Sequence, residues 1–554
     1  MRTCFLILAL AVVLAPGSAG AAQDVAGDWV GTLSAPGGQL RLIVHLTRNA
    51  SGALGGTLDS LDQGAMGIAI TKASLTGSNL NLAIDAVHGS YDGKVNAAGD
   101  TVHGTWTQAG QLELTLQRVD PSKLDGAWAG TLDFGTTKLR IILHLATGPQ
   151  GLIASLQSPD QGNAVIPASK VSLDAAGFVF EMDQVSARFA GKIDPSQTKI
   201  SGTFTQSGRP VNLELTRVKD GADVRPPRPQ NPQKPYPYRE DEVSYTNPKA
   251  NIKLAGTLTT PQGKGPFTAV LLITGSGPQD RDETIAGHKP FLVLADYLTR
   301  HGIAVLRADD RGVGQSGGQF ASATTADFAT DAEAGVAYLK TRPEIHAAKI
   351  GLIGHSEGGT IAPMVAARNR DVAFIVMLAG TGVTGDLIIV EQVRLIALAN
   401  GATQLQAESL AARQHQITEL VKSEQPLNVL KPKLRELLSD KPAAQIDTLT
   451  AELTSPWYRY FLSFDPATVL SKVTSPVLAL NGEKDMQVPP ALNLPAIRRV
   501  LTAAGNQHFE VVELPGLNHL FQHAKTGSPI EYGQIEETMA PEVLDLVAAW
   551  ITKQ

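Results

Sequence analysis

Short apolar runs alternate with helix-like stretches over the C-terminal part of the chain. The strand-like runs lie at residues 252–258, 269–273, 303–306, 350–353, 374–378, 477–480 and 509–514. The helix-like stretches between them include residues 290–299, 325–339 and 541–551. Strands that are apolar throughout, rather than at every second position, are typical of a sheet buried on both faces. The pattern therefore predicts an α/β domain whose mainly parallel sheet has helices on both sides.

One interval interrupts this alternation. Between residues 378 and 477 there is no strand-like run, and helix-like runs lie at 387–399, 405–421 and 429–438. Open α/β sheets bind ligands at the carboxyl ends of their strands. We therefore expect residues 383–472 to form a helical lid over those ends. The alternative is a helical appendage packed against the side of the domain.

The N-terminal part contains a duplication of strand-like segments. Residues 27–33 recur as 126–132, and residues 104–110 recur as 202–208, with further matched blocks between them in the same order. Within each copy, alternating apolar and polar runs are separated by turns rich in Gly, Asn and Asp, which is typical of a sandwich or barrel. The sequence predicts two repeated all-β domains, a small barrel or sandwich each, at residues 22–120 and 121–220.

Two matched pairs of residues in the repeats could suggest binding sites. His45 and His144 occupy equivalent strand positions, and Trp29 and Trp128 are equivalent as well. The histidines stand at alternate positions of apolar strands without a partner at metal-ligand spacing, so we expect them on the outer face. We expect the tryptophans to fill the cores rather than to stack on a sugar.

The remaining segments set the domain boundaries. A chain of 554 residues exceeds what one core usually supports. The proline-rich segment 221–241 predicts an extended linker, so the α/β domain spans residues 242–554.

Residues 1–21 combine a basic start, a short apolar run and a small-residue end, which predicts a secretory signal peptide. Cys4, the only cysteine, lies inside it, so the mature chain lacks cysteine chemistry.

Composition restricts the partners. The formal net charge is -6 and no Lys/Arg-rich tract is present, which argues against nucleic acid as a partner. No apolar run in the mature chain is long enough to span a bilayer. We therefore expect an exported protein, periplasmic or extracellular.

The strongest chemical signal is the sequence Gly354-His-Ser-Glu-Gly358, which follows the strand-like run 350–353 and enters a helix-like stretch. A sharp turn between strand and helix lifts the hydroxyl of its central residue out of the sheet. Ser356 is therefore the candidate nucleophile. In the alternative interpretation, Ser356 only caps the helix that follows.

A serine nucleophile needs a histidine base and an acid, and on this type of turn they follow in the order Ser, acid, His. Asp485 and Glu483 lie on the loop after the run 477–480, and we favour Asp485 because that loop must pass Gly482 before a carboxylate can face the serine. His519 follows the run 509–514 on a Gly-bearing loop and is favoured over His508 and His523.

The same chemistry needs two backbone N–H groups directed at one oxyanion. One is expected from Glu357, whose side chain need not take part. The other is expected from the loop after the run 269–273, where we favour the N–H of Ser276 over that of Gln279.

No cofactor and no metal are predicted. Residues 312–317 fit the pattern Gly-x-Gly-x-x-Gly, but the next helix-like stretch begins only near Thr325, so no helix N-terminus would meet a pyrophosphate. No His-Glu-x-x-His motif or carboxylate cluster suggests a catalytic metal.

Five motifs together resemble the exported bacterial α/β-hydrolases of the EstD esterase type, which are related to the serine aminopeptidase-like hydrolases. They lie at residues 275–281, 309–314, 354–358, 482–485 and 516–519. The resemblance covers residues 242–554 and implies an α/β-hydrolase fold. It also implies hydrolysis of carboxylic esters by a triad of Ser356, Asp485 and His519.

The leading hypothesis is an exported serine hydrolase that cleaves small-molecule carboxylic esters through an acyl-enzyme. A serine aminopeptidase or amidase would use the same triad. A hypothesis of another class gives the main role to the β domains, which would bind an envelope polymer.

Overall fold

The computed structural model describes residues 24–554 except 36–37, 109, 135–137, 162–163, 220–225, 424 and 441–442. The predicted signal peptide 1–21, with Cys4, lies outside the described residues, as does the start of the predicted linker. The chain divides into two compact units. The N-terminal unit comprises Met1–Asp133, Arg140–Ser158 and Ala164–Asp223, and the C-terminal unit comprises Phe134–Leu139, Pro159–Asn163 and Val224–Gln554.

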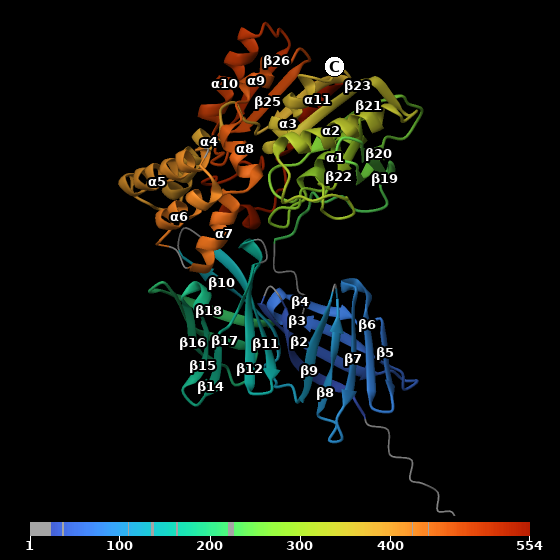
Figure 1. The fold of residues 1–554 in the computed structure, drawn as a ribbon, viewed down its shortest axis with the longest axis vertical. Coiled ribbons are helices and arrows are strands. Elements are labelled where there is room, and N and C mark those ends of the chain that lie inside the picture. The colour runs from blue at the N-terminus through green and yellow to red at the C-terminus, as the bar shows by residue number, and fades with distance from the viewer. Residues whose placement is uncertain are drawn as a thin grey trace, which may run out of the picture. The chain divides into compact units, whose positions relative to one another are not determined.

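The N-terminal unit contains two nine-stranded antiparallel sheets of the same strand order (Figure 1). The first sheet, in the order β4-β3-β2-β1-β9-β8-β7-β6-β5, is built from β1 (Gly27–Ala35), β2 (Gly38–Arg48), β3 (Leu54–Ser60), β4 (Ala65–Ala69), β5 (Lys72–Thr76), β6 (Asn79–Ile84), β7 (Gly89–Val95), β8 (Thr101–Thr107) and β9 (Gln111–Val119). The second is built from β10 (Gly126–Asp133), β11 (Lys138–Gly148), β12 (Gly151–Ser158), β13 (Ala164–Pro167), β14 (Lys170–Asp174), β15 (Gly177–Met182), β16 (Ala187–Ile193), β17 (Lys199–Gln206) and β18 (Arg209–Val218). Each sheet curls around its own core, which confirms the two all-β repeats.

The tryptophan in the first strand of each sheet has the same surroundings in the two repeats. Trp29 and Trp128 are both 0% exposed. Each indole N–H donates to the carbonyl four residues earlier, at 2.9 Å in both repeats. Both tryptophans therefore fill the cores, as expected from the sequence.

Only one of the matched histidines departs from the expected outer position. His144 is buried, with 3% of its surface exposed. His45 follows the core residue Val44 along β2 and keeps 35% of its side chain exposed, as expected. Its Nδ1 is 2.7 Å from Asp28 and its Nε2 is 3.1 Å from Asp59. Spacing along the chain did not reveal these partners, because Asp28 lies opposite His45 only through the pairing of β1 with β2.

The C-terminal unit is built on an eight-stranded sheet in the order β19-β20-β22-β21-β23-β24-β25-β26. Its strands are β19 (Arg239–Asn247), β20 (Ile252–Thr260), β21 (Phe267–Ile273), β22 (Ala304–Ala308), β23 (Ile345–His355), β24 (Val372–Leu378), β25 (Val477–Gly482) and β26 (Phe509–Leu514). From β22 to β26 in this order the neighbouring strands are parallel, and β19 and β20 are antiparallel additions at one edge. β19 begins inside the segment predicted as linker.

Helices cover both faces of this sheet (Figure 1). On one face lie α2 (Thr325–Lys340), α3 (Glu357–Ala366) and α10 (Pro490–Ala503), and on the other lie α1 (Pro290–Arg300) and α11 (Pro541–Thr552). Adjacent strand residues alternate between the two cores: Leu271 packs with the first group and Leu272 with the second. This arrangement confirms the predicted parallel α/β sheet.

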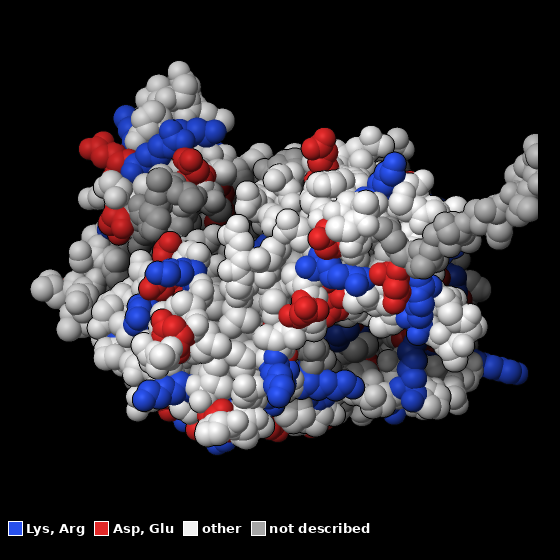
Figure 2. All heavy atoms as spheres, turned by 90° about the horizontal axis from the view of Figure 1, so that it is seen from below, with Lys and Arg blue, Asp and Glu red and all other residues white. Residues whose placement is uncertain are grey.

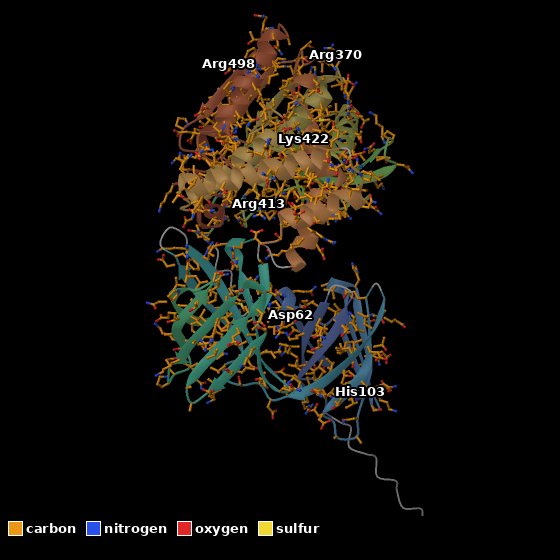
Figure 3. All side chains as sticks on the ribbon, turned by 60° about the vertical axis from the view of Figure 1, so that its left-hand side comes forward. Asp62, His103, Arg370, Arg413, Lys422 and Arg498 are labelled. Carbon is orange, nitrogen blue, oxygen red and sulfur yellow. The ribbon has the colours of Figure 1, made fainter. Side chains whose placement is uncertain are left out.

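A helical insertion, which we define as α4–α9, lies between β24 and β25. It consists of α4 (Gly385–Ala399), α5 (Gln404–Lys422), α6 (Leu427–Leu437), α7 (Ala443–Leu453), α8 (Pro456–Ser463) and α9 (Ala467–Leu470). Helices α4–α8 share an apolar core that includes Val421, Leu430 and Leu462, whereas Leu470 of α9 packs in a core of the sheet. Lys422, labelled in Figure 3, joins α5 to α4 through an ion pair of 2.5 Å with Asp386.

Charged side chains of both signs are interspersed on the face of the molecule that Figure 2 shows. Over the described residues of that face, neither sign forms one large patch. None of the helices in the described ranges is both long and apolar enough to cross a membrane.

Candidate active site

Ser356 occupies a strained turn between β23 and α3. Its backbone has φ 54° and ψ -114°, a left-handed region that non-glycine residues seldom adopt. The flanking glycines make the turn possible, because a Cβ at Gly354 would lie 1.9 Å from the carbonyl oxygen of Gly358, and one at Gly358 would lie 2.0 Å from that of Ile273. The turn therefore holds the hydroxyl at the carboxyl end of β23.

Asp485 and His519 come together from the loops after β25 and β26. Asp485 Oδ2 lies 2.8 Å from His519 Nδ1, and their side chains are 0% and 5% exposed. Asp485 Oδ1 accepts hydrogen bonds from the N–H groups of Gln487 and Val488. A carboxylate held in this way fixes the proton of His519 on Nδ1. His519 Nε2 makes no hydrogen bond within the described part of the chain and is left to act as a base.

The competing residues lie elsewhere. Glu483 is exposed and accepts a hydrogen bond from the N–H of Gly516 at 2.8 Å. His523 has 57% of its side chain exposed and pairs with Glu537, and His508 is exposed before β26. Of the residues weighed from the sequence, the structure therefore brings only Asp485 together with His519.

Ser356 and His519 line one cavity of about 210 Å³. Ser276 and Glu357 line it as well, and the helical insertion contributes apolar residues that include Ile388, Ile389, Tyr458 and Phe461. The insertion therefore forms part of the cavity wall above the carboxyl ends of the strands.

The N–H groups around Ser356 differ in availability. Gly275 donates to Glu283 at 2.7 Å and Gln279 donates to Asp310 at 2.9 Å, so neither of these N–H groups is free. The N–H groups of Ser276 and Glu357 make no hydrogen bond with any described residue. They are the two predicted oxyanion donors, and both residues line the cavity.

The side chain of Glu357 has a role that was not expected from the sequence. Its Oε1 accepts hydrogen bonds from the hydroxyl of Thr325 at 2.7 Å and from the indole N–H of Trp457 at 2.8 Å. Burial raises the pKa of this carboxyl, although both donors oppose the shift. Because Trp457 belongs to α8, this contact joins the helical insertion to the turn that carries Ser356.

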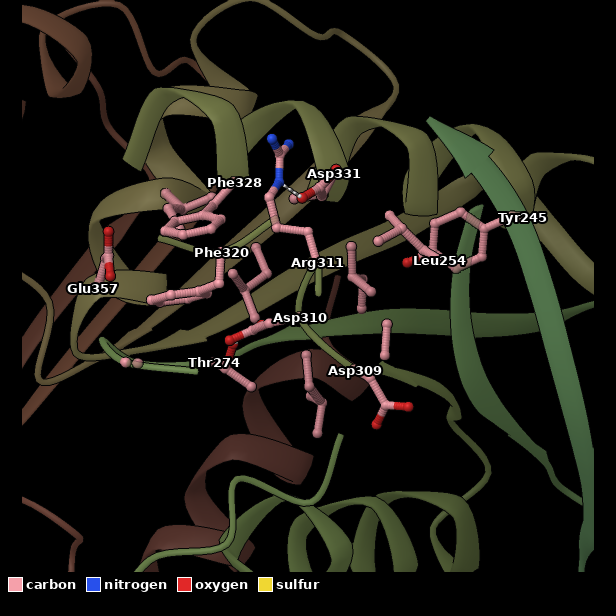
Figure 4. A pocket seen from close by; sticks show the side chains of 18 residues that line it. Tyr245, Leu254, Thr274, Asp309, Asp310, Arg311, Phe320, Phe328, Asp331 and Glu357 are labelled. Atoms are coloured by element: carbon pink, nitrogen blue, oxygen red, sulfur yellow. Dashed lines mark hydrogen bonds and ion pairs between the residues drawn. The ribbon is translucent and has the colours of Figure 1, made fainter. Parts of the chain in front are cut away.

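A second and smaller cavity of about 50 Å³ is lined by residues of β21, β22 and α2 together with Glu357 (Figure 4). Asp310 and Thr274 also line it and are joined by a hydrogen bond of 2.7 Å, and Arg311 pairs with Asp331 in its wall. Burial raises the pKa of Asp310 to about 7. Ser356 and His519 do not line this cavity, so the larger one is the candidate substrate site.

Glu283 and His355 also belong to the surroundings of Ser356, and sequence reasoning assigned a role to neither. They are 72 positions apart, and their side chains meet at 2.9 Å. No pattern in the sequence joins them, because only the folding of two loops brings them together. In the described ranges, no group of three or more His, Asp or Glu residues is placed to hold a metal.

The doubly covered parallel sheet, the strained Ser356 turn and the His519–Asp485 pair at the carboxyl ends of the strands define the α/β-hydrolase class. Comparison with known proteins agrees. The family model described as serine aminopeptidase, S33, matches residues 289–525. The esterase EstD of Thermotoga maritima is 29% identical over 363 residues, which are 64% of this chain and 74% of that protein. The C-terminal unit is an α/β-hydrolase that is similar to EstD.

Two solved esterase structures resemble part of the chain. The Pyrococcus furiosus esterase Pf2001 is 17% identical, with a TM-score of 0.36, and the match covers 57% of this chain and 93% of that one. Est1E from Butyrivibrio proteoclasticus, solved with ferulic acid bound, is 17% identical, with a TM-score of 0.33 and coverage of 56% and 96%.

Proposed function

We propose that this protein is a serine hydrolase that cleaves carboxylic esters through an acyl-enzyme. Ser356 is the nucleophile, His519 the general base and acid, and Asp485 the group that orients His519. The observation that carries the proposal is the imidazole of His519. Asp485 binds its Nδ1, while Nε2 is left unbound in a residue that shares a cavity with Ser356.

The reaction then follows from these positions. Ser356 Oγ attacks the ester carbonyl carbon while its proton passes to His519 Nε2, and Asp485 stabilises the resulting imidazolium. The alkoxide of the substrate leaves with the proton from Nε2, so the acyl group stays on Ser356. A water molecule, deprotonated by Nε2, attacks the acyl carbon, and Ser356 Oγ leaves with that proton.

The negative charge on the carbonyl oxygen needs two donors in both steps. The N–H groups of Ser276 and Glu357 suit this role because both are unbound and both residues line the cavity. Ser276 lies on the loop after β21, and Glu357 begins α3, where the helix dipole also favours negative charge.

Two observations support an ester with an apolar acyl group. The relative EstD is named an esterase, and the helical insertion lines the cavity with Ile388, Ile389 and Phe461. A hydrocarbon chain gains free energy when such side chains remove it from water.

A second candidate substrate is an aminoacyl amide. The matched family model is described as serine aminopeptidase, and Glu452 of α7 lines the cavity with a carboxylate that could bind a substrate amine. The two candidates use the same nucleophile and differ in the bond that is cleaved.

One experiment tests both candidates. We would measure kcat/KM for a p-nitrophenyl ester and for a p-nitroanilide with the same acyl group, with Ser356→Ala as the control. A strong preference for the ester is expected. Comparable cleavage of the anilide would favour the aminopeptidase, and turnover that survives in Ser356→Ala would overturn the proposed function.

We also propose that the protein is exported, because of the composition of residues 1–21. Cell fractionation tests this proposal, and cytoplasmic protein that keeps residues 1–21 would contradict it.

We further propose that the N-terminal unit contacts an envelope polymer. To test this, the retention of the full chain and of a chain from residue 226 onward is compared on isolated envelope material. Equal retention of the two chains would contradict a binding role.

A further inference from the structure

A single buried carboxylate connects the loops around Ser356. Glu283 lies between β21 and α1 and is 0% exposed. Its Oε1 accepts a hydrogen bond from the N–H of Gly275 at 2.7 Å and lies 2.9 Å from His355 Nδ1. Gly275 directly precedes Ser276, and His355 directly precedes Ser356, so Glu283 contacts the neighbour of the nucleophile and the neighbour of an oxyanion donor.

His355 extends this connection to the histidine base. Its Nε2 lies 3.0 Å from the carbonyl oxygen of His519, and the two imidazole rings are 4.8 Å apart between centroids. Glu283 and His355 therefore hold together three segments, which carry Ser276, Ser356 and His519. Neither Glu283 nor His355 lines the substrate cavity.

The hydrogen bonds fix the protons of this pair. A carbonyl oxygen only accepts, so His355 Nε2 carries a proton, and a second proton must lie between Nδ1 and Glu283 Oε1. Burial lowers the pKa of His355, but the charge and hydrogen bond of Glu283 outweigh it, so the net shift is upward. The other groups that face His355 are the carbonyl of His519, the titratable imidazole of His519 at 4.8 Å between ring centroids and, further away, the charge of Asp485.

This arrangement lowers rather than raises the stability of the folded chain. Glu283 has φ 53°, in the left-handed region, and its Oε2 is buried without a hydrogen-bond partner among the described residues. A buried oxygen left without a donor lowers the stability of the folded state. Strain and unsatisfied groups of this kind collect at functional sites.

We propose that Glu283 and His355 are a positioning pair for the reaction at Ser356. The pair sets the loop of Ser276 and the backbone of His519 relative to the nucleophile without touching the substrate. This inference rests on the proposed function. Gly275 makes the fit tight, because a Cβ there would lie 3.2 Å from Glu283 Oε1 and 3.3 Å from Ser356 Cβ.

The direct test is Glu283→Gln, which keeps the shape of the side chain and removes its charge. We expect kcat for a p-nitrophenyl ester to fall by about 10²-fold, the cost of a small misplacement of reacting groups, while KM changes little. Without the carboxylate, His355 loses its proton as the pH rises and then has a single N–H for two acceptors. The loss in kcat should therefore deepen toward high pH in the variant relative to the unsubstituted enzyme.

A matched control separates positioning from general destabilisation. Val547 is 0% exposed in α11, on the far face of the sheet from the turn, and Val547→Ala removes core contacts only. We expect this variant to lose thermal stability with kcat unchanged. His355→Gln, which retains one N–H donor, is a second variant if Glu283→Gln fails to fold, and it should show the same fall in kcat.

The outcomes distinguish this inference from the proposed function. If Ser356→Ala removes turnover but kcat in Glu283→Gln equals that of Val547→Ala at every pH, the positioning pair is wrong and the proposed function stands. If Ser356→Ala retains turnover, both fail. A fall in kcat that deepens with pH, with KM nearly constant, supports the pair.

Discussion

Two histidines of this chain bind carboxylates in different regions and with different consequences. In the C-terminal unit, Asp485 binds Nδ1 of His519, and Nε2 is left without a partner among the described residues. In the N-terminal unit, His45 is bound at both nitrogens, by Asp28 and by Asp59. A histidine–carboxylate pair therefore provides a general base only where one imidazole nitrogen stays unprotonated and faces a cavity.

The electrostatics of His45 follow from its two partners. The hydrogen bond of Asp28, followed by that of Asp59, raises the pKa of His45 to about 10. An imidazolium with both N–H groups bound cannot accept a proton, so His45 has a structural role. The second repeat supports this interpretation, because Ala127 and Gln157 stand at the positions of the two aspartates. Among the described residues, the imidazole of buried His144 bonds to Gln157 alone, at 2.9 Å.

The largest expected effect comes from removing the histidine with the free nitrogen. His519→Ala deletes the base, so kcat for a p-nitrophenyl ester should fall on the order of 10⁶-fold, as in other triads. His45→Gln is the matched substitution in the other region, and kcat should not change. Comparable losses of kcat in the two variants would contradict the assignment of His519 as the base and His45 as a structural residue.

The next effect concerns the carboxylate that fixes the tautomer. Asp485→Asn should lower kcat on the order of 10⁴-fold, because an amide no longer selects the Nδ1–H form of His519. Glu483→Gln is the control, since this exposed carboxylate binds the N–H of Gly516, and we expect its kcat to stay near that of the unsubstituted enzyme. A greater loss in Glu483→Gln than in Asp485→Asn would show that Asp485 is not the acid of the triad.

The smallest effect is on stability and depends on pH. The pKa of His45 is raised in the folded state from 6.5 to about 10, so the ion pairs contribute fully below pH 6.5 and are lost as the pH rises through 10. His45 is partly exposed, and about 1 kcal/mol is expected at pH 6.

Urea denaturation of the full chain at pH 6, 8 and 10 measures this contribution. The difference in unfolding free energy between the unsubstituted chain and His45→Gln should become smaller at each step from pH 6 to pH 10. His144→Gln provides the control in the second repeat, where Gln157 rather than a carboxylate contacts the imidazole. A His45→Gln cost that is constant with pH would show that the carboxylates do not hold a charged imidazole.

The sequence predicted what depends on local order along the chain. Asp485 and His519 follow strands at the carboxyl edge of a parallel sheet, so their meeting could be expected from strand order alone. The apolar runs likewise located most of the central strands, although β19, with its charged edge sequence, was assigned in part to the linker.

What the sequence could not predict depends on pairing between distant segments. Glu283 reaches His355 because the loop after β21 folds back on the end of β23, and Trp457 reaches Glu357 because the helical insertion covers the turn. His144 was expected outside because its strand alternates, but it is buried, and its imidazole bonds to Gln157 of β12. Such contacts are set by tertiary packing, which has no counterpart in the spacing of residues along the chain.

The most direct test of the central claim is to identify the residue that becomes acylated. A fluorophosphonate reacts covalently with an activated serine, and peptide mass spectrometry locates the modified residue. We expect one adduct, on Ser356. Its rate of formation should fall in His519→Ala and stay unchanged in His45→Gln. An adduct on another residue, or labelling of Ser356 that does not depend on His519, would contradict it.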